Sequence, residues 1–158
     1  MKLNNIDRQQ LIDLITSFHR VSALVVGDVC LDRYIFGEPI RLSREAPVPV
    51  LEWRREYALP GAASNPALNL ASLGAQVSLV GVVGDDSAAV ELRELLDKHG
   101  VDSSHLVSSP ERRTTEKTRI LAEGLLSLPQ QVARVDKVDR EPLRSHQISD
   151  LNKNIKNK

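Results

Sequence analysis

Two carboxylates follow a short apolar run near the start of the chain. The run ALVVGDV at residues 23–29 is rich in β-branched residues and predicts a strand buried on both faces. Asp28 and Asp32 lie at or just beyond its carboxyl end, which is where open α/β sheets place their ligands. Carboxylate oxygens accept hydrogen bonds from hydroxyl groups, so the pair suits a polyol. Alternatively, the two carboxylates only stabilise the fold: Asp28 caps the strand end and Asp32 forms an ion pair with Arg33 or Arg41.

An amide side chain lies in the small-residue segment PGAASNPALNLASLGA at residues 60–75. Gly61 permits a turn, Ser64 is the predicted N-cap, and an apolar stripe predicts a helix that ends at Gly74. Asn65 follows the cap, and its amide both donates and accepts hydrogen bonds. The free N–H groups of a helix start favour electronegative ligand atoms. Asn65 is therefore a second candidate ligand, with a further N-cap as the alternative.

Two cations alternate along a predicted strand at residues 114–123. Lys117 and Arg119 project from one face of this strand because side chains alternate with a period of two. Together they are candidates to bind an anion, and a solvated edge strand is the simpler alternative.

Other site chemistries find no support in the residue pattern. The sequence contains neither a Walker loop nor G-x-G-x-x-G, so it has no recognisable nucleotide cradle. It also lacks a nucleophile elbow. The four histidines are too far apart in the sequence for a zinc-ligand spacing; they are His19, His99, His105 and His146.

Composition indicates a soluble, cytoplasmic globular protein. The 158 residues include 21 Lys and Arg against 21 Asp and Glu, so no charge excess favours nucleic acid or an anionic membrane. No segment approaches the roughly 20 apolar residues that span a bilayer. The single cysteine, Cys30, is predicted to be a buried, reduced thiol.

The elements that must position these residues form an α/β pattern. An amphipathic helix is predicted over residues 7–19, and a second buried strand over 76–84. Asp85 or Asp86 then caps a helix that Gly100 ends. Strand, helix, strand, helix in this order predicts a parallel, right-handed core.

A different pattern occupies residues 34–60. Short candidate strands are broken by prolines, which favours a small, half-exposed sheet. Its aromatic residues, Tyr34, Phe36, Trp53 and Tyr57, predict a partner surface. Residues 114–123 and 130–138 are expected to pair as antiparallel strands. From Ser145 the chain is polar, which predicts a weak helix or a disordered tail at 145–158.

Several of these segments together resemble the N-terminal part of the ribokinase-like (PfkB) carbohydrate kinases. They are VVGDVCLDRYIFG, RLSREAPVPV, PGAASNPALNLASLGAQVSLVGVVGDD, TTEKTRIL and QQVARVD, and they run from about Val21 to Arg140. The segment RLSREAPVPV most resembles the heptose 7-phosphate kinases of this family. Those kinases phosphorylate O1 of D-glycero-D-manno-heptose 7-phosphate on the way to ADP-heptose, which is used for lipopolysaccharide.

The resemblance implies a truncated Rossmann-type α/β core, residues 1–144, with a small β-sheet lid at about 34–60. Asp32 matches the family's sugar-binding aspartate, and Gly61 and Asn65 match the glycine and asparagine of its sugar loop. Asp28, Lys117 and Arg119 are added as candidate substrate ligands. The implied cofactors are ATP and Mg²⁺, and the implied partners are a sugar phosphate and a second copy bound through the lid.

Two departures from the family pattern have consequences. Ala62 stands where a second glycine is usual, and its Cβ disfavours a positive φ. No copy of the family's catalytic segment, Gly-Ala-Gly-Asp, occurs in the sequence. We therefore expect no catalytic residue in this chain and little activity from it alone. The alternatives are a non-catalytic sugar-binding or dimerising fragment and a kinase for another sugar.

Overall fold

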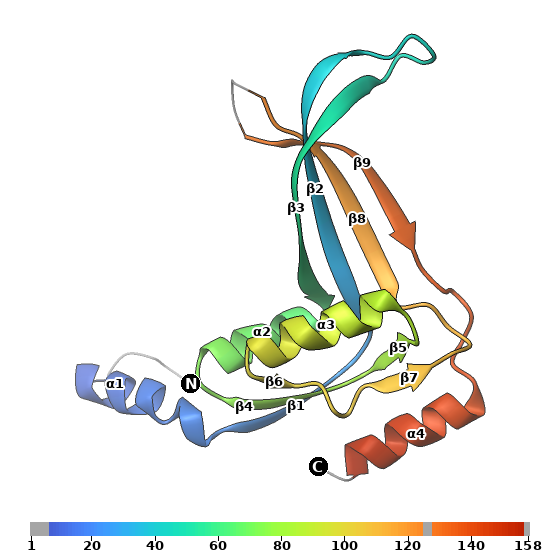
Figure 1. The fold of residues 1–158 in the computed structure, drawn as a ribbon. Coiled ribbons are helices and arrows are strands. Elements are labelled where there is room, and N and C mark those ends of the chain that lie inside the picture. Colours follow the sequence, from blue (N-terminus) through green and yellow to red (C-terminus); the bar gives the residue numbers. More distant parts are fainter. Residues whose placement is uncertain (1–6, 125–127, 157–158) are drawn as a thin grey trace.

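The computed structural model describes residues 7–124 and 128–156, which form an α/β layer and a long sheet that rises from it (Figure 1). In the layer, β1 (Ser22–Val26), β4 (Gln76–Val80) and β6 (Val101–Asp102) pair in parallel in the order β1-β4-β6. Beside them β5 (Val82–Gly84) pairs in parallel with β7 (Val107–Ser109). This arrangement confirms the predicted parallel α/β core.

Two helices supply most of the packing on these strands. α2 (Ser64–Ser72) and α3 (Ser87–Lys98) lie on one side of them in Figure 1, with α4 on the other. The apolar cluster between helices and strands comprises Val29, Leu31, Ala67, Val77, Leu79, Val83, Ala88, Ala89, Leu92, Leu96, Val101 and Leu106. The helix predicted after Asp85 or Asp86 is confirmed, with Asp86 as its N-cap.

The first predicted strand differs from expectation in extent and burial. β1 ends at Val26, and its residues alternate between exposed and partly buried, with Val26 51% exposed. It is an edge strand among the described residues, so one side lacks a neighbour that would cover it. The strand predicted at 76–84 is likewise divided at Gly81, where an added Cβ would lie 2.7 Å from the Gly27 carbonyl oxygen.

The rising sheet has four strands in the order β3-β2-β8-β9. They are β2 (Val29–Leu42), β3 (Pro49–Ala62), β8 (Thr115–Ala122) and β9 (Gln130–Lys137). β2 pairs antiparallel with β3 and parallel with β8, and β8 pairs antiparallel with β9 as predicted.

The prolines of this sheet do not break it into the short strands expected between residues 34 and 60. β2 and β3 each run for 14 residues. Pro39 lies at a register shift, and Pro49 is the first residue of β3, which is an edge strand. Both are positions where the missing N–H costs little.

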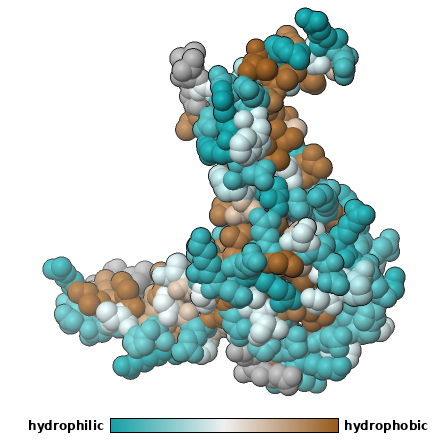
Figure 2. Space-filling model, viewed as in Figure 1, coloured by the Kyte–Doolittle hydropathy of each residue, from teal (hydrophilic) through white to brown (hydrophobic). Residues whose placement is uncertain are grey.

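Two terminal helices complete the described residues. α1 (Arg8–Thr16) confirms the predicted helix, and a 3-10 turn, η1 (Phe18–Arg20), follows. The apolar face of α1 is not covered by the described residues, since Ile15 is 60% exposed. Figure 2 shows hydrophobic surface on the part of the molecule that α1 forms. No helix among the described residues is both long and apolar enough to cross a membrane.

The polar C-terminal segment is helical in the structure. α4 (Ser145–Lys156) is held to the layer by Gln147, which is 1% exposed and donates to Ser109 Oγ at 2.7 Å. The disordered tail offered as one alternative for residues 145–158 therefore does not occur at 145–156. The buried glutamine explains why a largely polar sequence stays docked, since its amide is hydrogen-bonded at both ends.

Candidate functional site

Asp32 forms an ion pair across the rising sheet. Arg119 Nη1 donates to Asp32 Oδ1 at 2.8 Å, and both side chains are largely buried. The guanidinium also lies 5.1 Å from the ring centroid of Tyr34. The hydrogen bond and the charge of Asp32 raise the pKa of Arg119. We had considered Arg33 or Arg41 as the ion-pair partner of Asp32. This was wrong, because the pairing of β2 with β8 brings Arg119 next to Asp32.

Gly61 lies directly against this carboxylate. It is the register partner of Cys30, and a Cβ added to it would overlap Asp32 Oδ2 and lie 2.7 Å from Cys30 Sγ. A glycine at this position therefore leaves room for the Asp32 side chain. The thiol is buried as predicted, and burial followed by the charge of Asp32 raises the pKa of Cys30.

The residue after this glycine has an unusual backbone conformation. Ala62 has φ +51°, and it is the only non-glycine residue with positive φ in the described part of the chain. The chain adopts this conformation at Ala62 although its Cβ disfavours a positive φ. β3 ends here, and the next N–H, that of Ala63, donates to the Asp28 carbonyl at 2.8 Å. The connection to α2 is thus fixed despite the strain of a left-handed alanine.

The start of α2 differs from the prediction in its cap. Ala63 is the N-cap, and no side chain caps the helix. The hydroxyl of Ser64 is buried and has no hydrogen-bond partner among the described residues. The side chain of Asn65 is exposed and makes no hydrogen bond with another described residue. Its amide is therefore available to a ligand, and it does not act as a further cap.

A cavity of about 480 Å³ lies at the carboxyl ends of β1 and β4. Its walls include Asp28 and Lys117, so two of the predicted site residues meet there. Asp32, Gly61, Asn65 and Arg119 are not among its lining residues. Asp32 is nevertheless the register partner of Lys117 on the neighbouring strand, which places the two parts of the candidate site side by side.

Sequence reasoning missed two residues of this cavity. Arg112 and Arg113 line it, just before β8 begins. Arg112 is fixed because its guanidinium donates to the carbonyls of Glu141 at 2.7 Å and Asp139 at 3.2 Å. The adjacent arginines in the sequence ERRTT were a visible signal, but only the fold brings them next to Asp28.

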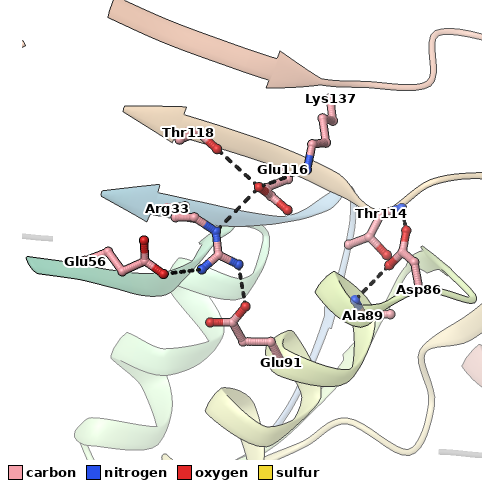
Figure 3. Close-up of polar contacts among 9 residues, drawn as sticks. All are labelled: Arg33, Glu56, Asp86, Ala89, Glu91, Thr114, Glu116, Thr118 and Lys137. Carbon is pink, nitrogen blue, oxygen red and sulfur yellow. Dashed lines mark hydrogen bonds and ion pairs between the residues drawn. The ribbon is translucent and has the colours of Figure 1, made fainter. Parts of the chain in front are cut away.

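A network of charges on the opposite face holds the rising sheet to α3 (Figure 3). Arg33 Nη2 donates to Glu91 of α3 at 2.5 Å, and its Nε lies 3.5 Å from Glu116 of β8. Glu116 also accepts from Lys137 of β9 at 3.4 Å. Because Asp32 and Arg33 are consecutive on β2, this network fixes the strand from one face while Asp32 faces the other.

A second attachment lies at the foot of the sheet (Figure 3). Asp86 accepts from the N–H of Ala89, as the N-cap of α3, and from the N–H of Thr114. Burial opposes ionisation of Asp86, but the hydrogen bonds from Thr114 and Ala89 outweigh it and lower the pKa. This carboxylate therefore joins the start of α3 to the start of β8.

The described residues assign neither ATP nor Mg²⁺ to particular side chains of this chain. Among them no three or more His, Cys, Asp and Glu side chains are grouped to hold a metal ion. We therefore derive no step through ATP or Mg²⁺ from the residues of this chain.

Comparison with known proteins defines the class of this fold. It resembles the carbohydrate kinase from Agrobacterium tumefaciens, with a TM-score of 0.58 and 25% identity over 74% of this chain and 35% of that one. It also resembles the ribokinase of Arabidopsis thaliana, complexed with ribose and ATP, with a TM-score of 0.56 and 22% identity over 74% and 35% of the two chains. The fold is that of the ribokinase-like sugar kinases.

The family follows from the sequence match. The model of the pfkB family of carbohydrate kinases matches residues 21–146, and the chain belongs to this family. Its sequence is also 44% identical to the bifunctional protein HldE of Caulobacter vibrioides over 132 residues. That match covers 84% of this chain and 26% of the relative, so the chain spans about a quarter of that protein.

Proposed function

We propose that this chain contributes the sugar-binding part of an ATP-dependent kinase that phosphorylates heptose 7-phosphate at O1. Family membership supports the sugar kinase, and the resemblance of RLSREAPVPV to the heptose 7-phosphate kinases supports the heptose. In this proposal residues 1–144 form the kinase part, about 34–60 act as its lid, and the protein works in the cytoplasm on a precursor of lipopolysaccharide.

The observation that carries the proposal is the arrangement of Asp32. Arg119 holds its carboxylate in place by a hydrogen bond, and Gly61, which has no Cβ, leaves space beside it. An oriented carboxylate accepts hydrogen bonds from sugar hydroxyls. The free amide of Asn65 and the carboxylate of Asp28 supply further polar contacts. In this proposal Arg119 positions Asp32, and Asp32 contacts the sugar.

Phosphoryl transfer needs more than a positioned acceptor. It also requires a group that takes the hydroxyl proton and donors that stabilise the transferred phosphoryl group. We assign neither role to a residue of this chain, so ATP and Mg²⁺ are proposed to bind elsewhere in the complete enzyme. We accordingly expect no measurable ATP consumption by the 158-residue chain with heptose 7-phosphate.

Binding tests the sugar site independently of turnover. Titration calorimetry with heptose 7-phosphate should give a dissociation constant for the wild type. Asp32→Asn should weaken binding by about ten- to a hundredfold, since a hydrogen bond to a charged group contributes about 1.5–3 kcal/mol. Asp13→Asn, on exposed α1, is the matched control and should leave binding unchanged. Equal binding by the two variants would refute the role of Asp32, and tighter binding of another sugar phosphate would favour a kinase for that sugar.

The exposed aromatic residues of the rising sheet favour a second role, that of an interface between two copies of the chain. Trp53 is 62% exposed and Tyr57 43% exposed, and Tyr57 stacks on Tyr34 at 5.0 Å between ring centroids. Exposed aromatic side chains are enriched in protein interfaces. We propose that two copies pair through this sheet, either as part of the kinase or as a non-catalytic fragment.

A further inference from the structure

Along β2, the packing of the rising sheet on the core ends at a charged pair. Val29 and Leu31 belong to the apolar cluster of the core, and no described residue of β2 beyond them does. Arg33 is the next residue on the same face of the strand, because side chains alternate with a period of two. Its Nη2 donates to Oε2 of Glu91 on α3 at 2.5 Å (Figure 3). Arg33 therefore extends the contact between sheet and core by one position beyond the apolar packing.

Each strand of the rising sheet contributes one charged residue to the network around this pair. They are Glu56 of β3, Arg33 of β2, Glu116 of β8 and Lys137 of β9. Arg33 Nη1 lies 4.0 Å from Glu56 Oε1, and its Nε lies 3.5 Å from Glu116 Oε1. Glu91, by contrast, lies on the core (Figure 3). It is thus the residue through which the charges of the sheet are attached to α3.

We infer that Glu91 is a positioning residue for sugar binding, which it affects through Arg33. The inference rests on the proposed function, in which the sugar contacts Asp32 on the rising sheet and Asn65 on α2 of the core. Binding to both requires that the sheet be held at one angle to the core, because misplaced contacts lose much of their energy. Asp32 and Arg33 are consecutive on β2. A bond that fixes Arg33 to α3 therefore also fixes the position of Asp32 relative to Asn65.

Loss of the Glu91 carboxylate should release the sheet without unfolding the protein. Arg33 keeps Glu56 and Glu116 as partners, and both belong to the sheet and move with it. No buried charge is therefore left without a partner, which is the costly consequence of breaking a buried ion pair. The foot of the sheet stays attached to α3 through Asp86. The expected result is a folded chain in which the sheet samples a wider range of angles to the core.

Titration calorimetry with heptose 7-phosphate on the 158-residue chain tests the inference. Glu91→Ala should weaken binding about threefold, the size expected when a partly exposed ion pair no longer holds the site. Glu91→Gln keeps an oxygen that accepts from Arg33 and should recover part of the loss. Glu94→Ala, exposed on the same helix, is the matched control and should bind like the wild type. In about 1 M NaCl the difference between wild type and Glu91→Ala should shrink, because salt screens a partly exposed pair.

The distance between the sheet and α3 supplies a second measurement that needs no sugar. Spin labels on Glu52→Cys of β3 and Lys98→Cys of α3, both at exposed positions, report this distance by double electron–electron resonance. Cys30 is 2% exposed, which protects it from labelling. Glu91→Ala should broaden the distribution of distances, and Glu94→Ala should leave it unchanged.

The outcomes separate this inference from the sugar proposal. If the wild type binds the sugar and Glu91→Ala binds it equally well, the inference is refuted and the Asp32 site stands. Weaker binding by Glu91→Ala with an unchanged distance distribution also refutes positioning by Glu91. A wild type that binds no heptose 7-phosphate refutes the sugar site and, with it, the role of Glu91 in sugar binding. Weaker binding together with a broadened distribution supports both.

Discussion

At the scale of single residues, the candidate site depends on small side chains beside a charged one. Gly61 leaves space for Asp32, and Ala62 adopts a left-handed conformation that alanine disfavours. The strain arises where β3 ends and the chain turns into α2. A glycine would adopt this conformation without the steric cost.

Ala62→Gly should therefore stabilise the fold. Relief of the left-handed conformation contributes about 1–2 kcal/mol, and the extra freedom of glycine in the unfolded chain removes about 0.5–1 kcal/mol of this. We expect a net increase of about 0.5–1 kcal/mol in the free energy of unfolding, measured by urea titration. Ala63→Gly is the control, since Ala63 has φ −60° and should lose stability. A loss of stability in Ala62→Gly would show that the alanine is not strained.

At the scale of elements, α3 holds the rising sheet to the core through two side-chain contacts. Arg33 reaches it from β2, and Asp86 joins its first turn to β8. Both contacts connect elements that are far apart in the sequence. They therefore fix the position of β2, the strand that carries Asp32, relative to the core.

The pair of Arg33 and Glu91 should couple the sheet to α3. A double-mutant cycle with Arg33→Gln and Glu91→Gln should give a coupling of about 0.5–1 kcal/mol in urea unfolding, because both groups keep some contact with solvent. Arg33→Gln alone should cost more than Glu91→Gln, since it also leaves Glu116, whose side chain is only 10% exposed, without its guanidinium partner. Purely additive effects of the two substitutions would mean that the contact does not join these elements.

Asp86 predicts a pH dependence with a defined sign. Burial opposes ionisation of Asp86, but hydrogen bonds lower its folded-state pKa below the ordinary value of about 3.8 for an aspartate. Its contribution is therefore complete above about pH 3.8 and is lost as the pH falls through the lower, folded-state pKa. Asp86→Asn keeps a side-chain oxygen that can cap α3 but does not titrate, so it should remove this acid-dependent part. Thermal unfolding of both proteins across this range checks it, and parallel curves would contradict it.

At the scale of the whole molecule, apolar surface remains open in several places. β1 is an edge strand in the described residues, α1 presents an uncovered apolar face, and the rising sheet exposes Trp53. Figure 2 shows hydrophobic surface on both projecting parts of the molecule. Surface of this kind is typical of interaction sites.

Pairing through the rising sheet predicts a concentration-dependent mass. Light scattering coupled to size exclusion should report a dimer for the wild type and a monomer for Trp53→Lys, because a charge placed in an apolar interface must be desolvated on association. Val90→Lys is the matched control: Val90 is 57% exposed on α3, and its substitution should leave the dimer intact. A monomeric wild type at high concentration would refute the proposal.

Much of the fold was accessible from local patterns. The caps of α3 and the alternating segments at 114–123 and 130–138 predicted these elements, because local patterns report helix ends and side-chain alternation. The apolar run at 23–29 predicted β1 but not its exposure. The continuity of β2 and β3 was missed, since prolines normally break strands and only the register shift and the edge position accommodate them. A weak helix was one expectation for residues 145–156, but its docking through the buried Gln147 is marked by no local pattern.

For the candidate site, the sequence by itself determined which residues could bind a sugar: Asp28, Asp32, Gly61 and Asn65. The tertiary structure decided how these side chains are combined. Arg119 lies 87 residues from Asp32 in the sequence yet donates to it, and Arg113 joins Lys117 in one cavity. The physical reason is that residue type and spacing govern local conformation, whereas the pairing of distant strands governs which charges meet.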